Sequence, residues 1–214
     1  MNLTPSSSTR FRGYLPVVID VETGGFNHNT DALLEIAAVF IDFNDDNSIL
    51  PANTVRHHIT PFLGSNLEPA SMEINKIDPN NPLRLSIDEK EALNDIFERV
   101  NDSLKQYQCK RAILVGHNAS FDLKFINAAV KRCSIKHSPF HSFSCFDTAT
   151  LCGVAYGHTV LARAVEIAGF DWDGSQAHSA AYDAEKTAEL FCDIVNRFKP
   201  IYRKISGLLI HTFS

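Results

Sequence analysis

Residues 14–25 read YLPVVIDVETGG, and their run of Val and Ile predicts a buried β-strand that stops at Thr23-Gly24-Gly25. Two acids, Asp20 and Glu22, lie near the carboxyl end of this strand. Side chains alternate along a strand, so both carboxylates point to the same side and can share one cation. Two solvated acids at a strand edge are the alternative interpretation. Since α/β sheets usually place their sites at this end of a central strand, the shared cation is favoured.

The sequence on either side of this strand predicts a mixed α/β sheet with helices packed on it. Further strands are expected at LLEIAAVFIDF (33–43), around VRHHI (55–59) and at RAILVG (111–116). Helices are expected from Ser86 to about Leu104 and over 121–130, 159–168 and 180–197. Asn118 or Ser120 is placed to cap the second of these. The four prolines within 61–85 predict mostly loop there.

The composition predicts one globular domain. The chain has 214 residues, of which 44% are hydrophobic. No stretch reaches the ~18 consecutive apolar residues of a membrane helix, and the opening MNLTPSSSTR lacks the apolar core of a secretory signal. We therefore expect a cytoplasmic protein. Residues 1–9, rich in Ser, Thr and Pro, are expected to be a flexible N-terminal segment.

The cysteines and the net charge narrow the range of ligands. The five cysteines form no Cys-x-x-Cys pair, so we expect reduced core residues and no zinc site. A formal net charge of −5 argues against a protein that coats nucleic acid through its overall field. Divalent ions held by clustered carboxylates would reverse the local field, so a polyanionic substrate is still compatible with this charge.

Two later segments each carry an acid five residues after a histidine: HNASFD at 117–122 and HSAAYD at 178–183. Taken alone, Asp122 and Asp183 are better explained as acids that interact with the dipole in the first turn of a helix, worth about 0.3–1 kcal/mol. On a continuous helix His178 and Asp183 would be about 140° apart. We therefore expect Asp183 on the helix and His178 on the loop before it, from which the imidazole can reach a metal site. A solvated loop histidine is the alternative.

The motifs DVETGG, HNASFD and HSAAYD, in this order, resemble the three motifs of the DEDDh family of 3′→5′ exonucleases. Similarity to the RNA-trimming members of that family extends to GYLPVVIDVETGGF, NKIDPNNP, FDTATL and QAHSAAYDAEKTAELFCDIVNRF, and so covers about Arg10 to Phe198. The resemblance implies a ribonuclease H-like mixed β-sheet flanked by α-helices. The exonuclease domain is expected at 10–199 and a C-terminal tail at 200–214.

The resemblance also implies the chemistry. Asp20, Glu22, Asp122 and Asp183 are the expected ligands of two divalent ions, Mg²⁺ with Mn²⁺ as a substitute. His178 is the expected general base, which takes a proton from the attacking water so that a nucleoside 5′-monophosphate is released. The expected substrates are single-stranded 3′ ends of structured RNAs, in tRNA end turnover and in maturation of rRNA and small stable RNAs, and single-stranded DNA.

Aromatic residues at family positions imply how the nucleic-acid strand is bound. Phe26, Phe121 and Phe143 match positions where rings stack on bases, which is worth roughly 1–3 kcal/mol per base. Core packing is the alternative for each of these phenylalanines. Ile74 departs from the pattern, because the RNA-trimming members carry phenylalanine there. An aliphatic side chain offers no aromatic stacking surface, so we expect weaker discrimination of the terminal base.

The resemblance also implies a homodimer, through four basic residues. Arg10, Arg12, Arg111 and Lys136 match basic positions that, in the RNA-trimming members, form a patch acting across a homodimer interface. Ordinary solvated surface charges are the alternative.

Three other functions compete with this interpretation. Two use the same chemistry: a proofreading subunit for DNA and a degrader of very short oligonucleotides. The segments shared with the RNA-trimming members disfavour both. The third is a catalytically idle scaffold that binds nucleic acid, and the presence of all five chemical residues argues against it.

Overall fold

The computed structural model describes residues 10–212, so the prediction for residues 1–9 lies outside the described residues. A five-stranded sheet forms the centre of the molecule, and its strands follow the order β3-β2-β1-β4-β5. The strands are β1 (Tyr14–Thr23), β2 (Leu33–Phe43), β3 (Ile49–His58), β4 (Arg111–Gly116) and β5 (Phe140–Asp147). β1 pairs antiparallel with β2 and parallel with β4, so the strand that carries the first two acids is the central one. The prediction of a mixed α/β sheet is confirmed.

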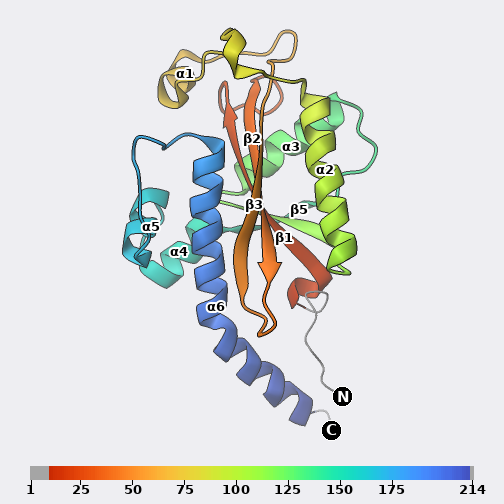
Figure 1. Ribbon diagram of the computed structural model, residues 1–214, viewed down its shortest axis with the longest axis vertical. Helices are drawn as coiled ribbons and strands as arrows, with labels where there is room; N and C mark the ends of the chain where they lie inside the picture. The colour runs from red at the N-terminus through yellow and green to blue at the C-terminus, as the bar shows by residue number, and fades with distance from the viewer. Residues whose placement is uncertain (1–9, 213–214) are drawn as a thin grey trace.

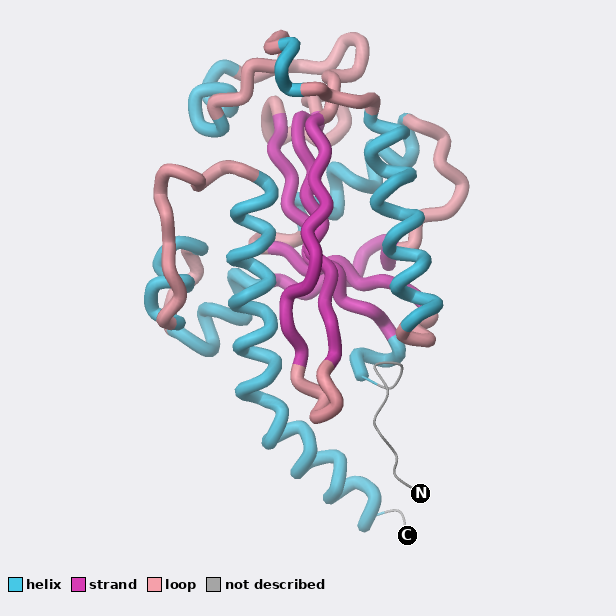
Figure 2. Tube along the Cα trace, in the orientation of Figure 1, coloured by secondary structure: helices cyan, strands magenta, loops and turns pink. Residues whose placement is uncertain are grey.

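Helices cover both faces of the sheet (Figures 1 and 2). One face packs against α2 (Glu89–Gln106) and α3 (Ser120–Arg132), through a cluster that includes Ile19 and Val21 of β1. The other face packs against α6 (Ala180–Thr212), through a cluster that includes Val18. The helices α4 (Thr148–Tyr156) and α5 (Leu161–Ala168) lie against α6 and share a third apolar cluster with it. Alternate residues of β1 therefore face different layers.

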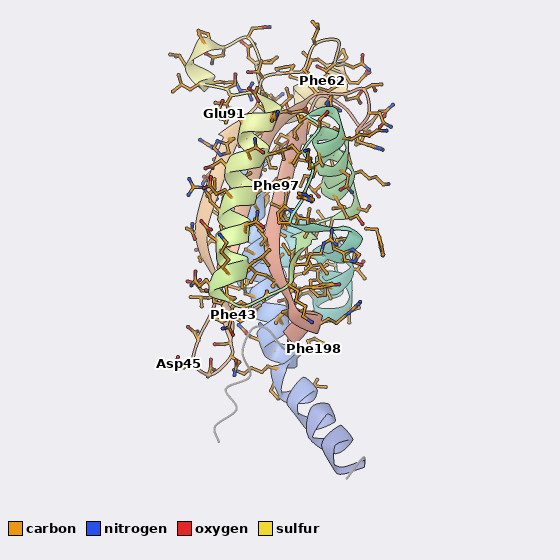
Figure 3. All side chains as sticks on the ribbon, turned by 90° about the vertical axis from the view of Figure 1, so that its right-hand side faces the viewer. Phe43, Asp45, Phe62, Glu91, Phe97 and Phe198 are labelled. Carbon is orange, nitrogen blue, oxygen red and sulfur yellow. The ribbon has the colours of Figure 1, made fainter. Side chains whose placement is uncertain are left out.

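Two labelled residues, Asp45 and Phe62, mark opposite ends of the sheet in Figure 3. Asp45 lies in the short turn between β2 and β3 at one end, and Phe62 lies in the long segment after β3 at the other. Phe97 of α2 packs between them with its ring 6.0 Å from that of Phe140. The carboxyl end of β1 lies toward the Phe62 end, because Glu22 pairs with Glu35 near the start of β2.

The sequence prediction missed several short elements. The segment 61–85 contains α1 (Pro69–Asn75) and the 3₁₀ turn η2 (Pro82–Arg84), where we expected mostly loop. In both, a proline stands in the first helical turn, where its missing amide has no partner to lose. β5 and α4 were not predicted either. β5 lies at the sheet edge, and its polar residues His141, Ser142 and Ser144 interrupt the apolar strand pattern.

Helix ends also differ from the sequence prediction. α2 begins at Glu89 with Asp88 as its cap, whose side chain accepts a hydrogen bond from the Glu91 amide, so Ser86 is not the helix start. Neither Asn118 nor Ser120 caps α3, because the residue at the cap position is Ala119. α6 continues past Pro200 to Thr212, whereas a proline inside a helix favoured an earlier end.

No helix among residues 10–212 is long and apolar enough to span a membrane.

Candidate active site

The first two acids face α6. Val18 packs in the α6 cluster, and Asp20 and Glu22 follow it at two-residue intervals, so both carboxyls are on that face of β1. Burial raises the pKa of Glu22 to about 8, with the charge of Asp183 as the next cause. The pKa of Asp20 is also raised well above its usual range, first by burial and then by the charges of Asp122 and Glu22. Without a cation, these carboxyls repel one another.

Asp122 reaches the same place from the opposite layer. It is the third residue of α3, only 3% exposed, and its Oδ1 accepts a hydrogen bond from the Val21 amide at 3.1 Å. Burial raises its pKa to about 8 despite that hydrogen bond. The approach depends on Gly116 at the end of β4, since a Cβ there would lie 3.2 Å from Asp122 Oδ2.

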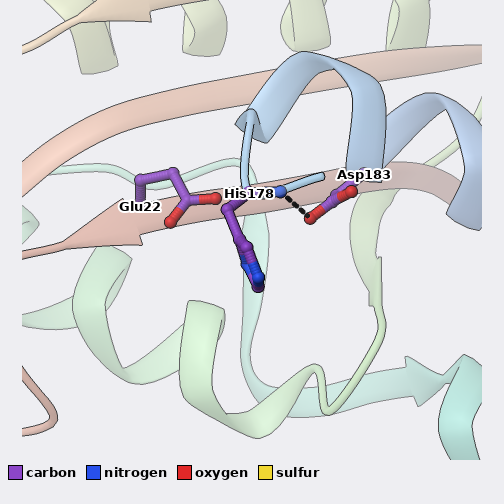
Figure 4. Close-up of side chains that lie close together, drawn as sticks. All are labelled: Glu22, His178 and Asp183. Atoms are coloured by element: carbon purple, nitrogen blue, oxygen red, sulfur yellow. Dashed lines mark hydrogen bonds between the residues drawn. The ribbon is translucent and has the colours of Figure 1, made fainter. Parts of the chain in front are cut away.

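Asp183 and His178 complete the cluster from the start of α6. Asp183 lies in the first turn, and His178 precedes the helix with a φ of 64°. This is the predicted arrangement, with the acid on the helix and the histidine on the loop. Ligand atoms of Glu22, His178 and Asp183 all lie within 4.8 Å of one another (Figure 4). Burial raises the pKa of Asp183, which the hydrogen bond from His178 partly offsets.

The cluster has the properties that a divalent cation requires. Its carboxylate oxygens are the hard ligands that Mg²⁺ prefers, and they come from three separate elements. Asp183 Oδ1 is buried and has no hydrogen-bond partner among the described residues. A cation would satisfy this oxygen, and its charge would compensate for the burial of the carboxylates and for the mutual repulsion that raises the pKa values of Asp20 and Glu22. The residues present therefore fit the metal that the motifs imply.

A cleft of about 150 Å³ opens beside these acids. Its lining residues are Val21, Glu22, Thr23, Gly25, Phe26, Ser71, Ile74, Asn75 and Phe121. The Phe26 side chain is 81% exposed, and its ring stands edge-on to that of Phe121 with centroids 6.1 Å apart. The structure thus brings Phe26, Ile74 and Phe121 together next to Glu22. Phe143 is not part of this cleft.

Phe143 instead contacts His141, which links it through Tyr14 to two of the predicted basic residues. Its ring is 4.4 Å from that of His141, which is 5.7 Å from the ring of Tyr14. The Arg12 guanidinium lies 5.4 Å from the same Tyr14 ring. Arg111, the residue paired with Tyr14 on β4, donates a hydrogen bond from Nε to the carbonyl of Phe140 at 3.1 Å.

The other two predicted basic residues are less well defined. Lys136 is exposed and follows α3. Arg10 begins η1 (Arg10–Gly13), but its side chain lies outside the described residues.

The structure adds residues that the sequence analysis did not single out. Glu35 of β2 lies directly opposite Glu22. Its place as the one acid within the apolar run LLEIAAVF is the sequence feature that could have identified it. Asp147 accepts hydrogen bonds from the amides of Asn118 and Thr150, and so joins the loop before α3 to the start of α4. Asn75 donates a hydrogen bond to the Thr23 carbonyl at 3.1 Å, which holds α1 against the end of β1. The hydrogen bonds from Asn118 to Asp147 and from Asn75 to Thr23 join residues 29 and 52 positions apart, so they left no local pattern.

The glycines after β1 have a packing role. A Cβ on Gly25 would lie 2.1 Å from Asp31 Oδ2, and one on Gly24 would lie 2.6 Å from the Asn66 carbonyl oxygen. Both approaches are too close for any side chain, so folding of the loop onto itself accounts for the Gly-Gly pair.

Comparisons with known proteins show the family of this chain. Residues 17–191 match the family model described as "Exonuclease", the RNase T model. The chain is 58% identical to ribonuclease T from Shewanella denitrificans over 192 residues, which is 90% of this chain and 85% of that protein.

Among solved structures, E. coli exonuclease I in complex with a dT13 oligonucleotide superposes with a TM-score of 0.65 at 15% identity, over 89% of this chain and 43% of that one. This chain thus spans less than half of exonuclease I. A full-length 3′-exonuclease superposes with a TM-score of 0.62 at 17% identity, over 86% of this chain and 83% of that one. Both likenesses show the fold, whereas the family match and the 58% identity show descent. The chain therefore belongs to the exonuclease family that includes ribonuclease T, hydrolases that remove nucleotides from the 3′ end of nucleic acids.

Proposed function

We propose that this exonuclease trims single-stranded 3′ ends of structured RNA, and also of DNA, with two divalent ions and His178 as general base. The observation that carries the proposal is the convergence of four carboxylates with one histidine. Glu22, His178 and Asp183 lie within 4.8 Å of one another, and the charges of Asp122 and Asp183 act on Asp20. A strand edge with solvated acids would not bury these groups.

The family uses divalent metals, and here Mg²⁺ is the ion that the ligands fit best, with Mn²⁺ as a substitute. Asp20, Glu22, Asp122 and Asp183 would hold two ions between them. Bound ions would neutralise the charge that develops on the phosphate and stabilise both the attacking and the leaving oxygen.

The chain's own residues supply the proton transfer. His178 takes a proton from the water that attacks the last phosphodiester. The new bond joins the water oxygen to phosphorus, the bond from phosphorus to the 3′ oxygen breaks, and that oxygen gains a proton from solvent. The products are a nucleoside 5′-monophosphate and a strand one residue shorter with a free 3′ hydroxyl. General-base help of this kind is worth about 10²–10⁴-fold.

The cleft beside the acids would hold the 3′-terminal base. Phe26 is exposed and edge-on to Phe121, so a base can stack on it without being recognised by sequence. Ile74 of α1 and Phe26 both line the cleft, and stacking on an exposed ring requires an unpaired base, so we expect a single-stranded end to bind there. Turnover of tRNA ends and maturation of rRNA and small stable RNAs are processes that need such trimming.

A homodimer is the second part of the proposal. Arg12 and Arg111 lie at the Tyr14 end of β1, whereas Glu22 lies at the other end of the same strand. Eight residues of extended strand span roughly 26 Å, which separates the two sites within one subunit. A basic patch formed by Arg10, Arg12, Arg111 and Lys136 would instead guide RNA to the active site of a second copy.

The direct test is incubation of purified protein with Mg²⁺ and end-labelled single-stranded and double-stranded RNA and DNA. We expect single-stranded ends to shorten from the 3′ side with nucleoside 5′-monophosphates as products, and EDTA to stop the reaction. Shortening from the 5′ end, or products with 3′ phosphates, would contradict the proposal. Binding without cleavage would identify an idle scaffold.

A further inference from the structure

The segment that carries His178 joins α5 to α6 over residues 169–179 (Figure 1). His178 is exposed, and its backbone amide is held by Asp183 in the first turn of α6 (Figure 4). Proton transfer needs the imidazole at a defined place, since a misplacement of about 1 Å at a catalytic group can reduce turnover by on the order of 10²-fold. The attachments of the rest of this segment therefore bear on catalysis.

Residues 173–176 form a turn that one carboxylate closes. The Asp173 carboxylate accepts hydrogen bonds from the amide and the hydroxyl of Ser175 at 2.9 and 2.7 Å, and from the Gln176 side chain at 2.9 Å. The Gln176 amide also donates to the Asp173 carbonyl at 3.0 Å. These hydrogen bonds order the turn internally, so its position on the molecule depends on where Asp173 itself is attached.

Tyr182 of α6 provides that attachment. The Asp173 amide donates a hydrogen bond to the Tyr182 hydroxyl oxygen at 2.6 Å. The Tyr182 ring lies 5.2 Å from the ring of Trp172, which packs against the apolar cluster shared by α4, α5 and α6. Lys186 Nζ, one helical turn further on, lies 5.6 Å from the centroid of the same Tyr182 ring. Tyr182 thus contacts two consecutive residues of the segment, one through its hydroxyl and one through its ring.

The two attachments of this segment come from neighbouring residues of one helical turn. Tyr182 holds Asp173, and Asp183 holds His178. Within the described residues 10–212, the hydrogen bonds of 173–178 either close the turn or end on these two residues of α6. Loss of the contacts to Tyr182 would leave this stretch attached to α6 at His178 alone.

We propose that Tyr182 is a positioning residue, which holds the segment before α6 through Trp172 and Asp173 and thereby keeps His178 beside Glu22. The inference rests on the proposed function for its kinetic consequence only. Tyr182 is not among the residues that line the cleft, and it acts through the segment that carries His178. Its hydroxyl makes one hydrogen bond, which favours the attached arrangement by a factor of about 2 to 12. The contact between the two rings adds to this factor.

Two substitutions separate the hydroxyl from the ring. Tyr182→Phe removes only the hydroxyl, and we expect kcat to fall by about 2- to 12-fold with little change in KM. Tyr182→Ala removes both, and we expect a fall on the order of 10²-fold. Tyr156→Phe is the matched control, because the Tyr156 hydroxyl also donates a hydrogen bond to α6, at Asp193, and Arg197 lies 5.8 Å from its ring. Equal losses of kcat in Tyr182→Phe and Tyr156→Phe would overturn the inference.

The effect of Tyr182 should disappear when His178 is absent. In a His178→Ala background, Tyr182→Ala should cause no further loss of kcat, because changes to residues that act through one group are not additive. If Tyr182→Ala reduced kcat by the same factor in both backgrounds, Tyr182 would act independently of His178 and the inference would be wrong.

A second measurement does not depend on activity. Trp172 is the one tryptophan in the chain, so its fluorescence reports on this segment without a label. In EDTA without substrate, we expect its anisotropy to fall in Tyr182→Phe, to fall further in Tyr182→Ala, and to keep the wild-type value in Tyr156→Phe. Unchanged anisotropy in both Tyr182 variants would overturn the inference, and so would a lower anisotropy with unchanged kcat.

Two further outcomes are covered by the same experiments. If Tyr182→Ala fails to fold, Tyr182→Phe still decides the question, because it keeps the ring and loses only the hydrogen bond to Asp173. If wild-type protein fails to shorten any 3′ end, the proposed function is wrong, while the anisotropy of Trp172 still decides whether Tyr182 holds the segment.

Discussion

The backbone amide of His178 donates a hydrogen bond of 3.1 Å to Oδ2 of Asp183, five residues further along the chain. His178 has a left-handed backbone conformation, with φ of 64°, and Asp183 lies in the first turn of α6. This hydrogen bond closes the loop onto the helix. The imidazole can therefore stay near Glu22 and Asp183, although the sequence spacing would separate His178 and Asp183 on a continuous helix.

His178→Ala should reduce kcat by on the order of 10²–10⁴-fold while substrate binding is largely kept, because only the general base is removed. Single-turnover kinetics and binding of a labelled oligonucleotide in Ca²⁺ would separate the two effects. His158→Ala, at a partly buried histidine outside the acid cluster and the cleft, is the control. A loss confined to affinity would make His178 a contact residue and place the base elsewhere.

Asp20→Asn and Asp183→Asn should each abolish cleavage and leave the fold intact. Removing one of four mutually repelling carboxylates relieves repulsion when no metal is bound, so the melting temperature in EDTA should stay level or rise. Circular dichroism melts with and without Mg²⁺ check the second expectation. Full activity of either variant in Mg²⁺ would rule out the assignment of these acids as metal ligands.

The stability of the metal-free protein should fall as pH rises. Burial raises the pKa of both Glu22 and Asp122 to about 8, so the folded state binds more protons than the unfolded state between roughly pH 5 and 8. The stabilising contribution of these protonated carboxyls is present below the unfolded pKa and is lost as pH rises through the folded one. We expect melting temperatures in EDTA to decrease across this window, and the decrease to be smaller in Mg²⁺. A melting temperature in EDTA that rises with pH across this window would contradict the burial of these acids.

Ile74→Phe should tighten binding of the 3′-terminal nucleotide. Ile74 is 54% exposed in the cleft with Phe26, and aromatic stacking on a base is worth roughly 1–3 kcal/mol, which corresponds to at least a fivefold lower KM. The preference among the four terminal bases should also become stronger. Ile167→Phe is a matched control, because Ile167 on α5 is likewise 54% exposed. Equal effects of both variants would exclude a specific role for position 74.

The proposed homodimer predicts complementation between two defective chains. One chain carries Asp20→Asn with an intact basic patch, and the other carries an intact site with Arg12, Arg111 and Lys136 changed to Ala. Each homodimer should be poor on long RNA, whereas the mixture should regain activity because one composite site is whole. Each lost phosphate contact should also reduce the salt slope of binding by about one unit.

Proof of subunit exchange is the control for this experiment, for example by mass photometry of differently tagged chains. If exchange occurs and the mixture is as inactive as its parents, the proposal that the basic patch of one subunit guides RNA to the active site of the other is wrong.

The sequence alone determined the parts of this protein that depend on local periodicity. The Val and Ile run placed β1, and strand alternation put Asp20 and Glu22 on one face. Helical spacing predicted most of α2, and the five-residue interval separated His178 from the helix that carries Asp183. The order of the three motifs indicated the exonuclease family before any contact between them was known.

Only the tertiary structure decided how distant segments meet. Asp122 approaches the other acids because its Oδ1 accepts a hydrogen bond from the amide of Val21, 101 residues away, and Glu35 lies opposite Glu22 through sheet register. Phe143 matches a family position for stacking on a base, yet its ring packs against His141 and is not among the residues that line the cleft. Such outcomes depend on pairing, burial and the approach of other backbone atoms, which are properties of the folded chain and have no periodic trace along the sequence.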